Sequence, residues 1–273
     1  MNYMMEAGMG EERPGAVALR LPEKRGLFYG GAWHRGGDRA FIENPATGLR
    51  LAEIDTANVQ DVEAAVAAAA AGFSVWRDVA PLERGRILRE MAAVIRAHAD
   101  ELALLDAADS GNPYLYMVPD VAAAAAFVDF FAGLITEVKG SSIPMGPDAV
   151  NFSTRQPLGV VARLLAFNHP LMFCAAKSAA ILAAGNAVIV KPPEQAPLSA
   201  LRLAELTGHL FPPGVFNIVP GDRVAGEALV AHPGVAAAAL VGSVAAGRAV
   251  MRTAAERVKP VVLELGGKNP LIA

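Results

Sequence analysis

Two segments of the sequence carry a polar side chain that could act in a reaction, and each follows an apolar run. In Phe167-Asn168-His169-Pro170, the asparagine amide could donate a hydrogen bond to an oxyanion that develops at a carbonyl. Taken alone, an asparagine that caps the helix opened by Pro170 is the more common arrangement. In Glu264-Leu265-Gly266-Gly267-Lys268, burial of the carboxylate would raise its pKa toward that of a general base. Glu264 could equally accept hydrogen bonds from nearby backbone amides.

Two further segments suit a nucleotide. Lys191-Pro192-Pro193-Glu194 places a lysine and a carboxylate three residues apart on a loop stiffened by prolines, and the pair could bind the hydroxyls of a ribose. The carboxylate would repel a 2′-phosphate, which favours NAD over NADP. Gly242-Ser243 comes before a predicted helix, whose free N–H groups attract phosphate. The alternatives are a solvated loop in which Glu194 caps the next helix, and a turn in which Ser243 is only a helix cap.

His169 and Cys174 have more ordinary interpretations. His169 is either a polar residue lining a tunnel or a buried histidine with satisfied hydrogen bonds. Cys174 is the single cysteine, and its place one turn into an apolar helix favours a buried structural thiol. One cysteine also excludes a disulfide framework and a cysteine-based zinc cluster, and we expect no metal site.

The elements that position these segments alternate regularly from residue 159 onward. Short apolar runs predict strands, and the stretches between them predict helices. This order is typical of an α/β fold, a Rossmann-like parallel sheet with helices on both faces, which binds ligands at the carboxyl ends of its strands. The predicted strands are 160–165, 187–190, 215–219, 236–241 and 260–265, and the predicted helices are 171–184, 198–210, 224–231 and 245–257.

The first half of the chain predicts a helical segment, preceded by turns between short strands at Gly30-Gly31-Ala32-Trp33 and Asn44-Pro45-Ala46-Thr47-Gly48. Its helices are recognised by a capping residue or a proline ahead of apolar positions spaced three or four apart. The predicted helices begin at Asn58, at Pro81 and near Pro119, and they end near Trp76, Ser110 and Lys139.

Two other segments differ from this helical pattern. Residues 140–158 predict an extended, projecting β-hairpin, which is either a surface loop or a site of strand pairing with another subunit. Residues 1–25 are expected to be a mobile lead-in. The N-terminus has no basic region followed by an apolar run, so we do not expect a secretory signal.

Composition narrows the class of protein. The 273 residues are 53% hydrophobic, so the chain can bury a sizeable core and is not expected to be disordered. A net charge of −3 gives no electrostatic basis for nucleic-acid binding. The most apolar run, 121–135, is shorter than the roughly 20 residues that a spanning helix needs. We therefore expect a soluble, cytoplasmic protein without a membrane or nucleic-acid partner.

Taken together, the motifs resemble the N-terminal, cofactor-binding half of the NAD(P)-dependent aldehyde dehydrogenase superfamily. The resemblance runs from Phe28 to Ala273, and the number of motifs in one order makes it specific. They are Asn44-Pro45-Ala46-Thr47-Gly48, Trp76-Arg77, Glu83-Arg84, Gln156-Pro157-Leu158-Gly159-Val160-Val161, Phe167-Asn168-His169-Pro170, Ala183-Ala184-Gly185-Asn186, Lys191-Pro192-Pro193-Glu194, Pro213-Gly214-Val215, Gly242-Ser243 and Glu264-Leu265-Gly266-Gly267-Lys268.

The resemblance implies a role for each matching residue. Asn168 matches the oxyanion-hole asparagine, Glu264 the general base that activates the deacylating water, and Lys177 a lysine assigned to a charge relay in some members. Lys191 and Glu194 match the contacts to the adenosine ribose of NAD. The other implied cofactor contacts are Ala166, Phe167, Pro193, Gly221, Gly226, Gly242, Ser243 and Leu265.

The resemblance also implies a domain organisation. Residues 26–139 and 159–264 would form the cofactor-binding domain, and 140–158 would be the oligomerisation hairpin of a homodimer or homotetramer. Residues 265–273 would begin a catalytic domain that this chain lacks.

Three positions depart from the family pattern. Phe167 replaces a tryptophan and Leu240-Val241 replaces Phe-Thr, and both changes keep apolar packing. The family nucleophile is a cysteine a few dozen residues beyond the Glu-Leu-Gly-Gly-Lys motif, whereas this chain ends nine residues beyond Glu264. We therefore expect NAD-dependent oxidation of an aldehyde to a carboxylic acid in the complete enzyme and no such activity in this chain alone. The alternatives are an inactive module that binds a nucleotide or a partner, and a truncated product without function.

Overall fold

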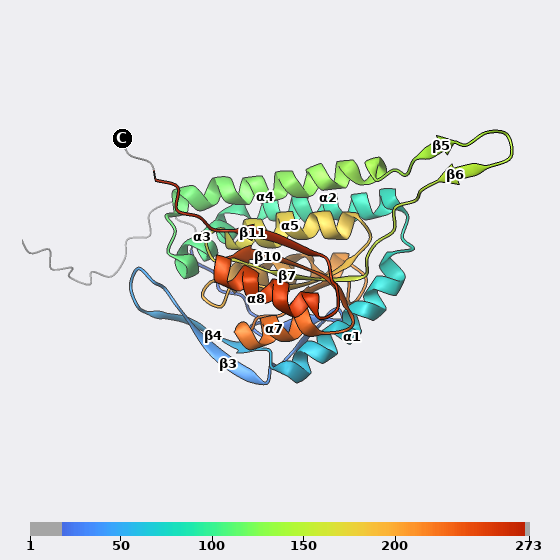
Figure 1. Cartoon of the computed structure of the whole chain (residues 1–273). Helices are drawn as coiled ribbons and strands as arrows, with labels where there is room; N and C mark the ends of the chain where they lie inside the picture. The colour runs from blue at the N-terminus through green and yellow to red at the C-terminus, as the bar shows by residue number, and fades with distance from the viewer. Residues whose placement is uncertain (1–17, 271–273) are drawn as a thin grey trace, which may run out of the picture.

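A mixed seven-stranded sheet forms the centre of the molecule (Figure 1). The structure is a computed structural model that describes residues 18–270, so most of the expected lead-in lies outside the described residues. The strand order is β11-β10-β7-β8-β9-β1-β2. The first five of these run parallel, which confirms the predicted Rossmann-like α/β fold. They are β7 (Val160–Leu164), β8 (Ala187–Lys191), β9 (Phe216–Ile218), β10 (Val235–Gly242) and β11 (Val261–Leu265).

An antiparallel hairpin extends the sheet beyond β9. Strands β1 (Leu27–Tyr29) and β2 (Ala32–His34) are joined by Gly30 and Gly31, whose φ angles of +61° and +74° suit glycine. β1 pairs with β9 at Phe28 and Ile218. The predicted turn, Gly30 to Trp33, was two residues too long, because Ala32 and Trp33 lie within β2.

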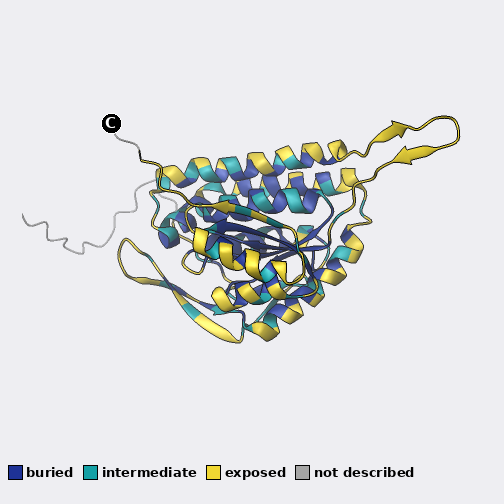
Figure 2. Cartoon of the chain, viewed as in Figure 1, coloured by how far each residue is buried: buried dark blue, intermediate teal, exposed yellow. Residues whose placement is uncertain are grey.

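Helices cover both faces of the sheet. One core cluster packs helices α2 to α6 against a face that includes Val188 and Val190, and two others pack α1, α7 and α8 against the face that includes Ile189 and Leu240. Figure 2 shows that the centre of the sheet is buried. Every residue of β8 is buried, and because side chains alternate between the two faces of a strand, its sequence is an almost continuous apolar run. The helices that follow the parallel strands are α5 (Pro170–Ala183), α6 (Leu198–Thr207), α7 (Arg223–Ala231) and α8 (Val244–Ala255).

The helical segment matches the prediction at its start and differs at its middle. Asn58 caps α1 (Val59–Trp76) through a reciprocal capping box with Asp61. The single helix expected from Pro81 to Ser110 is two helices, α2 (Pro81–Ala97) and α3 (Ala99–Ser110), which separate at His98. The apolar stripe continues across this break, which is why the pattern indicated one helix.

Helix α4 (Tyr114–Leu134) begins five residues before the predicted start and is followed by a 3₁₀ turn, Ile135–Glu137. Proline is typical of a first helical position, which favoured Pro119 as the start. Instead, Pro119 lies in the second turn of the helix.

The stretch Tyr114–Glu137 is long and apolar enough to cross a membrane, the one such helix among the described residues. A core helix of a globular protein passes the same test of length and composition. Here Val121 and Val128 are fully buried in the cluster that also contains α2 and α5 residues, so one side of α4 belongs to the protein core.

Two further hairpins complete the chain. β3 (Asp38–Glu43) pairs with β4 (Arg50–Thr56), and β5 (Ser142–Pro144) pairs with β6 (Val150–Phe152). Every residue of β5 and β6 is exposed, and the hairpin projects away from the body of the molecule (Figure 1). The predicted projecting hairpin is therefore present, and its role in oligomerisation remains a prediction.

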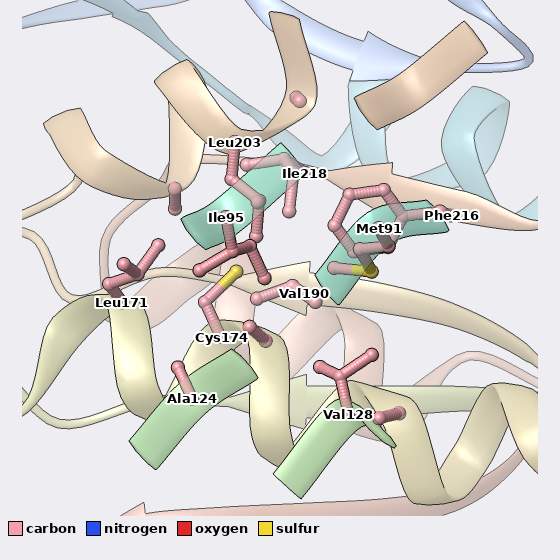
Figure 3. Packing of buried hydrophobic residues seen from close by; sticks show 14 of the residues in the cluster. Met91, Ile95, Ala124, Val128, Leu171, Cys174, Val190, Leu203, Phe216 and Ile218 are labelled. Carbon is pink, nitrogen blue, oxygen red and sulfur yellow. The ribbon is translucent and has the colours of Figure 1, made fainter. Parts of the chain in front are cut away.

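Helix α5 packs against both β8 and α4, and its side chains meet those of α2 and α6 in the core (Figure 3). Its Cys174 is fully buried among Ile95, Leu171 and Val190, and burial raises the pKa of the thiol well above its usual range. This confirms the interpretation of Cys174 as a structural cysteine.

Candidate active site and cofactor site

The register of the parallel strands brings the four sequence motifs to one edge of the sheet. Lys191, Leu164, Leu240 and Leu263 form one row across β8, β7, β10 and β11. Side chains in one row point to the same face, so Lys191 faces helices α7 and α8. Glu264 is one residue further along β11 and points to the opposite face, toward α5. The carboxyl edge therefore offers two sites, one on each face of the sheet.

The first site is an open pocket of about 770 Å³ that we call the Asn168 pocket. It collects Asn168 and Glu264 on its walls together with five predicted cofactor contacts. The apolar Phe173 contributes an aromatic surface. Its lining is Ala166, Phe167, Asn168, Phe173, Val241, Gly242, Ser243, Val244, Glu264, Leu265, Gly266, Gly267 and Lys268.

Asn168 lies in the turn between β7 and α5 and is exposed to this pocket. The residue at the cap of α5 is His169, and its side chain makes no capping hydrogen bond. The alternative in which Asn168 serves as the helix cap is therefore wrong. Its side-chain amide makes no hydrogen bond to another described residue, so its N–H groups are available to a ligand.

Glu264 forms an ion pair with Lys177 of α5, with 2.9 Å between Oε2 and Nζ. The two side chains are 51% and 41% exposed, so the expectation that the Glu264 carboxylate is buried is wrong. The reason is that β11 is the edge strand of the sheet. Helix α8 packs on the face that carries Leu263, whereas the face that carries Glu264 is largely open, as the 66% exposure of Val262 shows. The structure thus brings together Asn168, Glu264 and Lys177, the three predicted catalytic residues, around one pocket and its rim.

The second site is a pocket of about 460 Å³ that we call the Lys191 pocket. Its walls come from the ends of β7 and β10 and from helices α7 and α8. Four predicted cofactor contacts line it: Lys191, Glu194, Gly226 and Ser243. At Gly226, a Cβ atom would approach Leu164 Cδ2 to 2.9 Å and Lys191 Cε to 3.3 Å, so glycine keeps space open beside the lysine.

Lys191 and Glu194 differ in their surroundings. Lys191 is buried, its Nζ donates to the carbonyl of Pro192 at 3.2 Å, and burial lowers its pKa, against the smaller effects of Glu194 and Asp222. Glu194 is exposed on the pocket wall. The cap of α6 is Pro197, so the alternative in which Glu194 caps that helix in a solvated loop is wrong.

Ser243 connects the two pockets, because it lines both. Its hydroxyl caps α8 by accepting from the N–H of Ala246 at 3.1 Å, so the predicted serine cap is confirmed. A capped helix still presents free N–H groups and the positive end of its dipole at its first turn. The start of α8 is therefore suited to bind the anionic part of a ligand whose two ends occupy the Asn168 pocket and the Lys191 pocket.

Two predicted contacts lie elsewhere. Pro193 and Gly221 line a third hollow of about 330 Å³, between the β3–β4 hairpin and the loops that follow β8 and β9. Glu194 borders both this hollow and the Lys191 pocket. The structure therefore does not place Pro193 and Gly221 in the pockets that share Ser243.

The sequence interpretation missed a buried cation beneath this edge. Arg163 of β7 is only 4% exposed, and its Nε and Nη2 have no hydrogen-bond partner among the described residues. Burial lowers its pKa to about 10, against a smaller opposing effect of the Glu264 charge. An arginine inside an apolar strand was the available signal.

His169 is held by a neighbouring helix. Its Nδ1 contacts the Asp120 carboxylate of α4, and its ring packs edge-on against Phe173 with 5.4 Å between centroids. His169 therefore has a polar partner, as the second interpretation expected, but its side chain is 38% exposed, so the expectation of a buried histidine is wrong.

The parallel sheet, the pocket at each face of its carboxyl edge and the helix start between them define a Rossmann-like fold of the nucleotide-binding type. Comparison with known proteins identifies the family. The profile of the aldehyde dehydrogenase family matches residues 33–273. The chain therefore belongs to the aldehyde dehydrogenase family, as its motifs indicated.

Three relatives illustrate the similarity. Aldehyde dehydrogenase tropH from Talaromyces stipitatus is 47% identical over 259 residues, covering 93% of this chain and 50% of the relative. Betaine aldehyde dehydrogenase from Vibrio vulnificus is 44% identical over 231 residues, covering 84% and 48%. The NAD+ complex of an aldehyde dehydrogenase from Bacillus cereus superposes with a TM-score of 0.88 at 37% identity, covering 91% of this chain and 52% of that one. The chain thus spans about half the length of the relatives it matches.

Proposed function

We propose that this chain is the cofactor-binding half of an enzyme that oxidises an aldehyde to a carboxylic acid with NAD. The observation that carries the proposal is that Ser243 lines both pockets. The Asn168 pocket also contains Glu264, and the Lys191 pocket also contains Glu194. This arrangement suits a dinucleotide, because the adenosine would lie in the Lys191 pocket and the pyrophosphate at the start of α8. The space beside Gly226 fits this placement.

The proposed roles follow from the chemistry of each side chain. The amide of Asn168 would donate to the oxygen of the aldehyde as negative charge develops there. Glu264 would accept a proton from water, with Lys177 as its charged neighbour at 2.9 Å. When bound, the cofactor supplies a nicotinamide that accepts a hydride from the substrate. The remaining proposed contacts are Ala166, Phe167, Pro193, Gly221, Gly242 and Leu265.

We propose that the 273-residue chain binds NAD but does not oxidise aldehydes by itself. The reaction needs a thiolate nucleophile, and the single cysteine of the chain, Cys174, is fully buried with a raised pKa. Clear NAD-dependent aldehyde oxidation by the purified chain would contradict this part of the proposal.

Cofactor choice is proposed to depend on Glu194. Its carboxylate can accept hydrogen bonds from the ribose hydroxyls and would repel the 2′-phosphate of NADP. Calorimetric titration of the chain with NAD and with NADP tests this directly. Glu194→Gln is expected to weaken NAD binding about tenfold and to narrow the preference over NADP.

Glu227→Gln is the matched control, because Glu227 lines the same pocket from α7. It is expected to leave NAD affinity within about twofold of wild type. Absence of both heat and a thermal shift with NAD, in a chain whose circular dichroism shows a folded state, would overturn the proposed cofactor site.

We further propose that the β5–β6 hairpin pairs with a second copy in a homo-oligomer. The support is its full exposure together with apolar side chains at Ile143, Val150 and Phe152. Sedimentation of the chain with and without Val150→Lys and Phe152→Lys tests this, and an unchanged mass would contradict it. A cytoplasmic location and the absence of nucleic-acid or membrane partners remain predictions.

A further inference from the structure

The turn that carries Asn168 has little local support. Residues 168–171, which we call the Asn168 turn, lead from β7 into α5. The cap residue His169 makes no side-chain hydrogen bond to the start of the helix, and Asn168 itself is exposed. Pro170 and Leu171 are buried at the start of α5, so Asn168 and His169 are the residues of the turn that would be free to fray without further support.

Three side chains from another part of the fold contact this turn. Asn112 Nδ2 donates to the backbone carbonyl of Asn168 at 3.1 Å. Asp106 Oδ2 accepts from the N–H of Leu171 at 3.1 Å, and the Asp120 carboxylate contacts His169 Nδ1. We call Asp106, Asn112 and Asp120 the α3–α4 corner, because they lie at the end of α3, in the connection and at the start of α4.

These contacts reach three of the four residues of the turn from one direction. Asp106 is completely buried, so its carboxyl group is fixed by the core. Asn112 is fixed in turn, because its Nδ2 also donates to Ser110 Oγ at 2.9 Å. The Asp120 carboxylate contacts the imidazole of His169, and Phe173 packs against the same ring in a T-shaped arrangement.

We propose that the α3–α4 corner positions the catalytic Asn168. The proposal rests on the proposed function only in naming Asn168 as the oxyanion donor. An oxyanion donor is effective when its direction is set before the reaction, since no energy is then lost in reorienting it. The corner residues touch neither pocket, so they act through the turn and are positioning residues.

Amide hydrogen exchange of the full chain without nucleotide tests the proposal. The reporters are the N–H groups of Leu171 and Phe173, which donate to Asp106 and to the carbonyl of His169. Asn112→Ala and Asp120→Ala are each expected to raise exchange at these amides about fivefold, the typical effect of one lost hydrogen bond, and more in combination. Asp120→Asn keeps an acceptor for His169 and is expected to restore most of the protection.

The NMR signals of the Asn168 side chain distinguish a positioning effect from a general loss of stability. In a chain labelled with 15N-asparagine, the side-chain amide signals of Asn168 are expected to broaden or to move toward random-coil values in Asn112→Ala. Asn151→Ala on the exposed strand β6 is the control and is expected to leave both measurements unchanged.

Two outcomes would overturn the proposal. One is unchanged exchange at Leu171 and Phe173 in the double variant. The other is an equal rise in exchange through the start of α8, which would indicate global destabilisation. NAD titration of the same variants is a separate measurement, and binding within about twofold of wild type is expected because the Lys191 pocket is untouched. If the proposed cofactor site is wrong, the NAD titration will show it. The hydrogen-exchange measurement will still test the positioning role of the α3–α4 corner.

Discussion

Replacement of the buried Asp106 by asparagine should make the chain more stable at neutral and alkaline pH. The carboxyl group is fully buried, its Oδ2 accepts from Leu171, and its Oδ1 has no hydrogen-bond partner in the described chain. Burial raises its pKa to about 7, against a smaller opposing effect of the hydrogen bond from Leu171. Asparagine keeps an acceptor for the N–H of Leu171 and removes the charge that burial penalises.

The sign and size follow from proton linkage. An aspartate in the unfolded chain loses its proton near pH 4, whereas Asp106 in the native chain keeps its proton until about pH 7. Between these values the native state binds more protons, so the free energy of unfolding falls as the pH rises. A difference of about 3 pKa units corresponds to an upper limit of about 4 kcal/mol at pH 8. Asp109 is shifted in the same direction by burial, and part of its shift comes from Asp106.

Urea unfolding of wild type and Asp106→Asn between pH 4 and pH 8 measures this effect. The two proteins should have similar stability at pH 4, and the variant should gain up to about 4 kcal/mol at pH 8. Asp148→Asn in the exposed turn of the projecting hairpin is the control and should follow wild type throughout. Parallel curves for wild type and Asp106→Asn, or a variant less stable at pH 8, would refute the reasoning.

Three other substitutions test separate features of the fold and the site. Gly226→Ala should weaken NAD binding and lower the free energy of unfolding by about 1–3 kcal/mol, because the added Cβ would meet Leu164 at 2.9 Å. Calorimetry measures the first effect, and urea unfolding measures the second. Asn58→Ala should lower stability by about 0.5–2 kcal/mol through loss of the capping box of α1, visible as a lower thermal midpoint. Arg163→Met should raise stability by about 1–3 kcal/mol, since it removes buried donors without partners, and a loss of stability in urea would contradict this.

The parallel half of the fold could be predicted closely because its signals are local. Strand β8 is buried on both faces, so its apolar run marks its ends within one residue. The pairing of β1 with β9 has no such signal, since it joins Phe28 to Ile218 across most of the chain. The break at His98 was also hidden, because neither glycine nor proline marks it and the apolar stripe runs through it.

The residues that form the site could be predicted from the sequence, whereas their exposure and their contacts with distant segments could be predicted less well. Strand ends and turn residues located Asn168, Ser243 and Glu264, and parallel pairing then brings them to one edge. The half-exposed ion pair of Glu264 depends on β11 being the edge strand, which the order of elements along the chain does not specify. The contact between Asn112 and Asn168 spans 56 residues, and no local pattern indicates it.

Helix α3 reaches both ends of the proposed site without forming a wall of either the Asn168 pocket or the Lys191 pocket. Asp106 accepts from the first turn of α5, and Asp109, three residues later, accepts from the N–H of Leu198 at the start of α6 at 2.9 Å. One short helix thus holds the first turns of α5 and α6. These two helices follow directly after the turn that carries Asn168 and the loop that carries Glu194. Chimeras between relatives should therefore tolerate exchange of the Asn168 turn and the Glu194 loop only when α3 is exchanged with them.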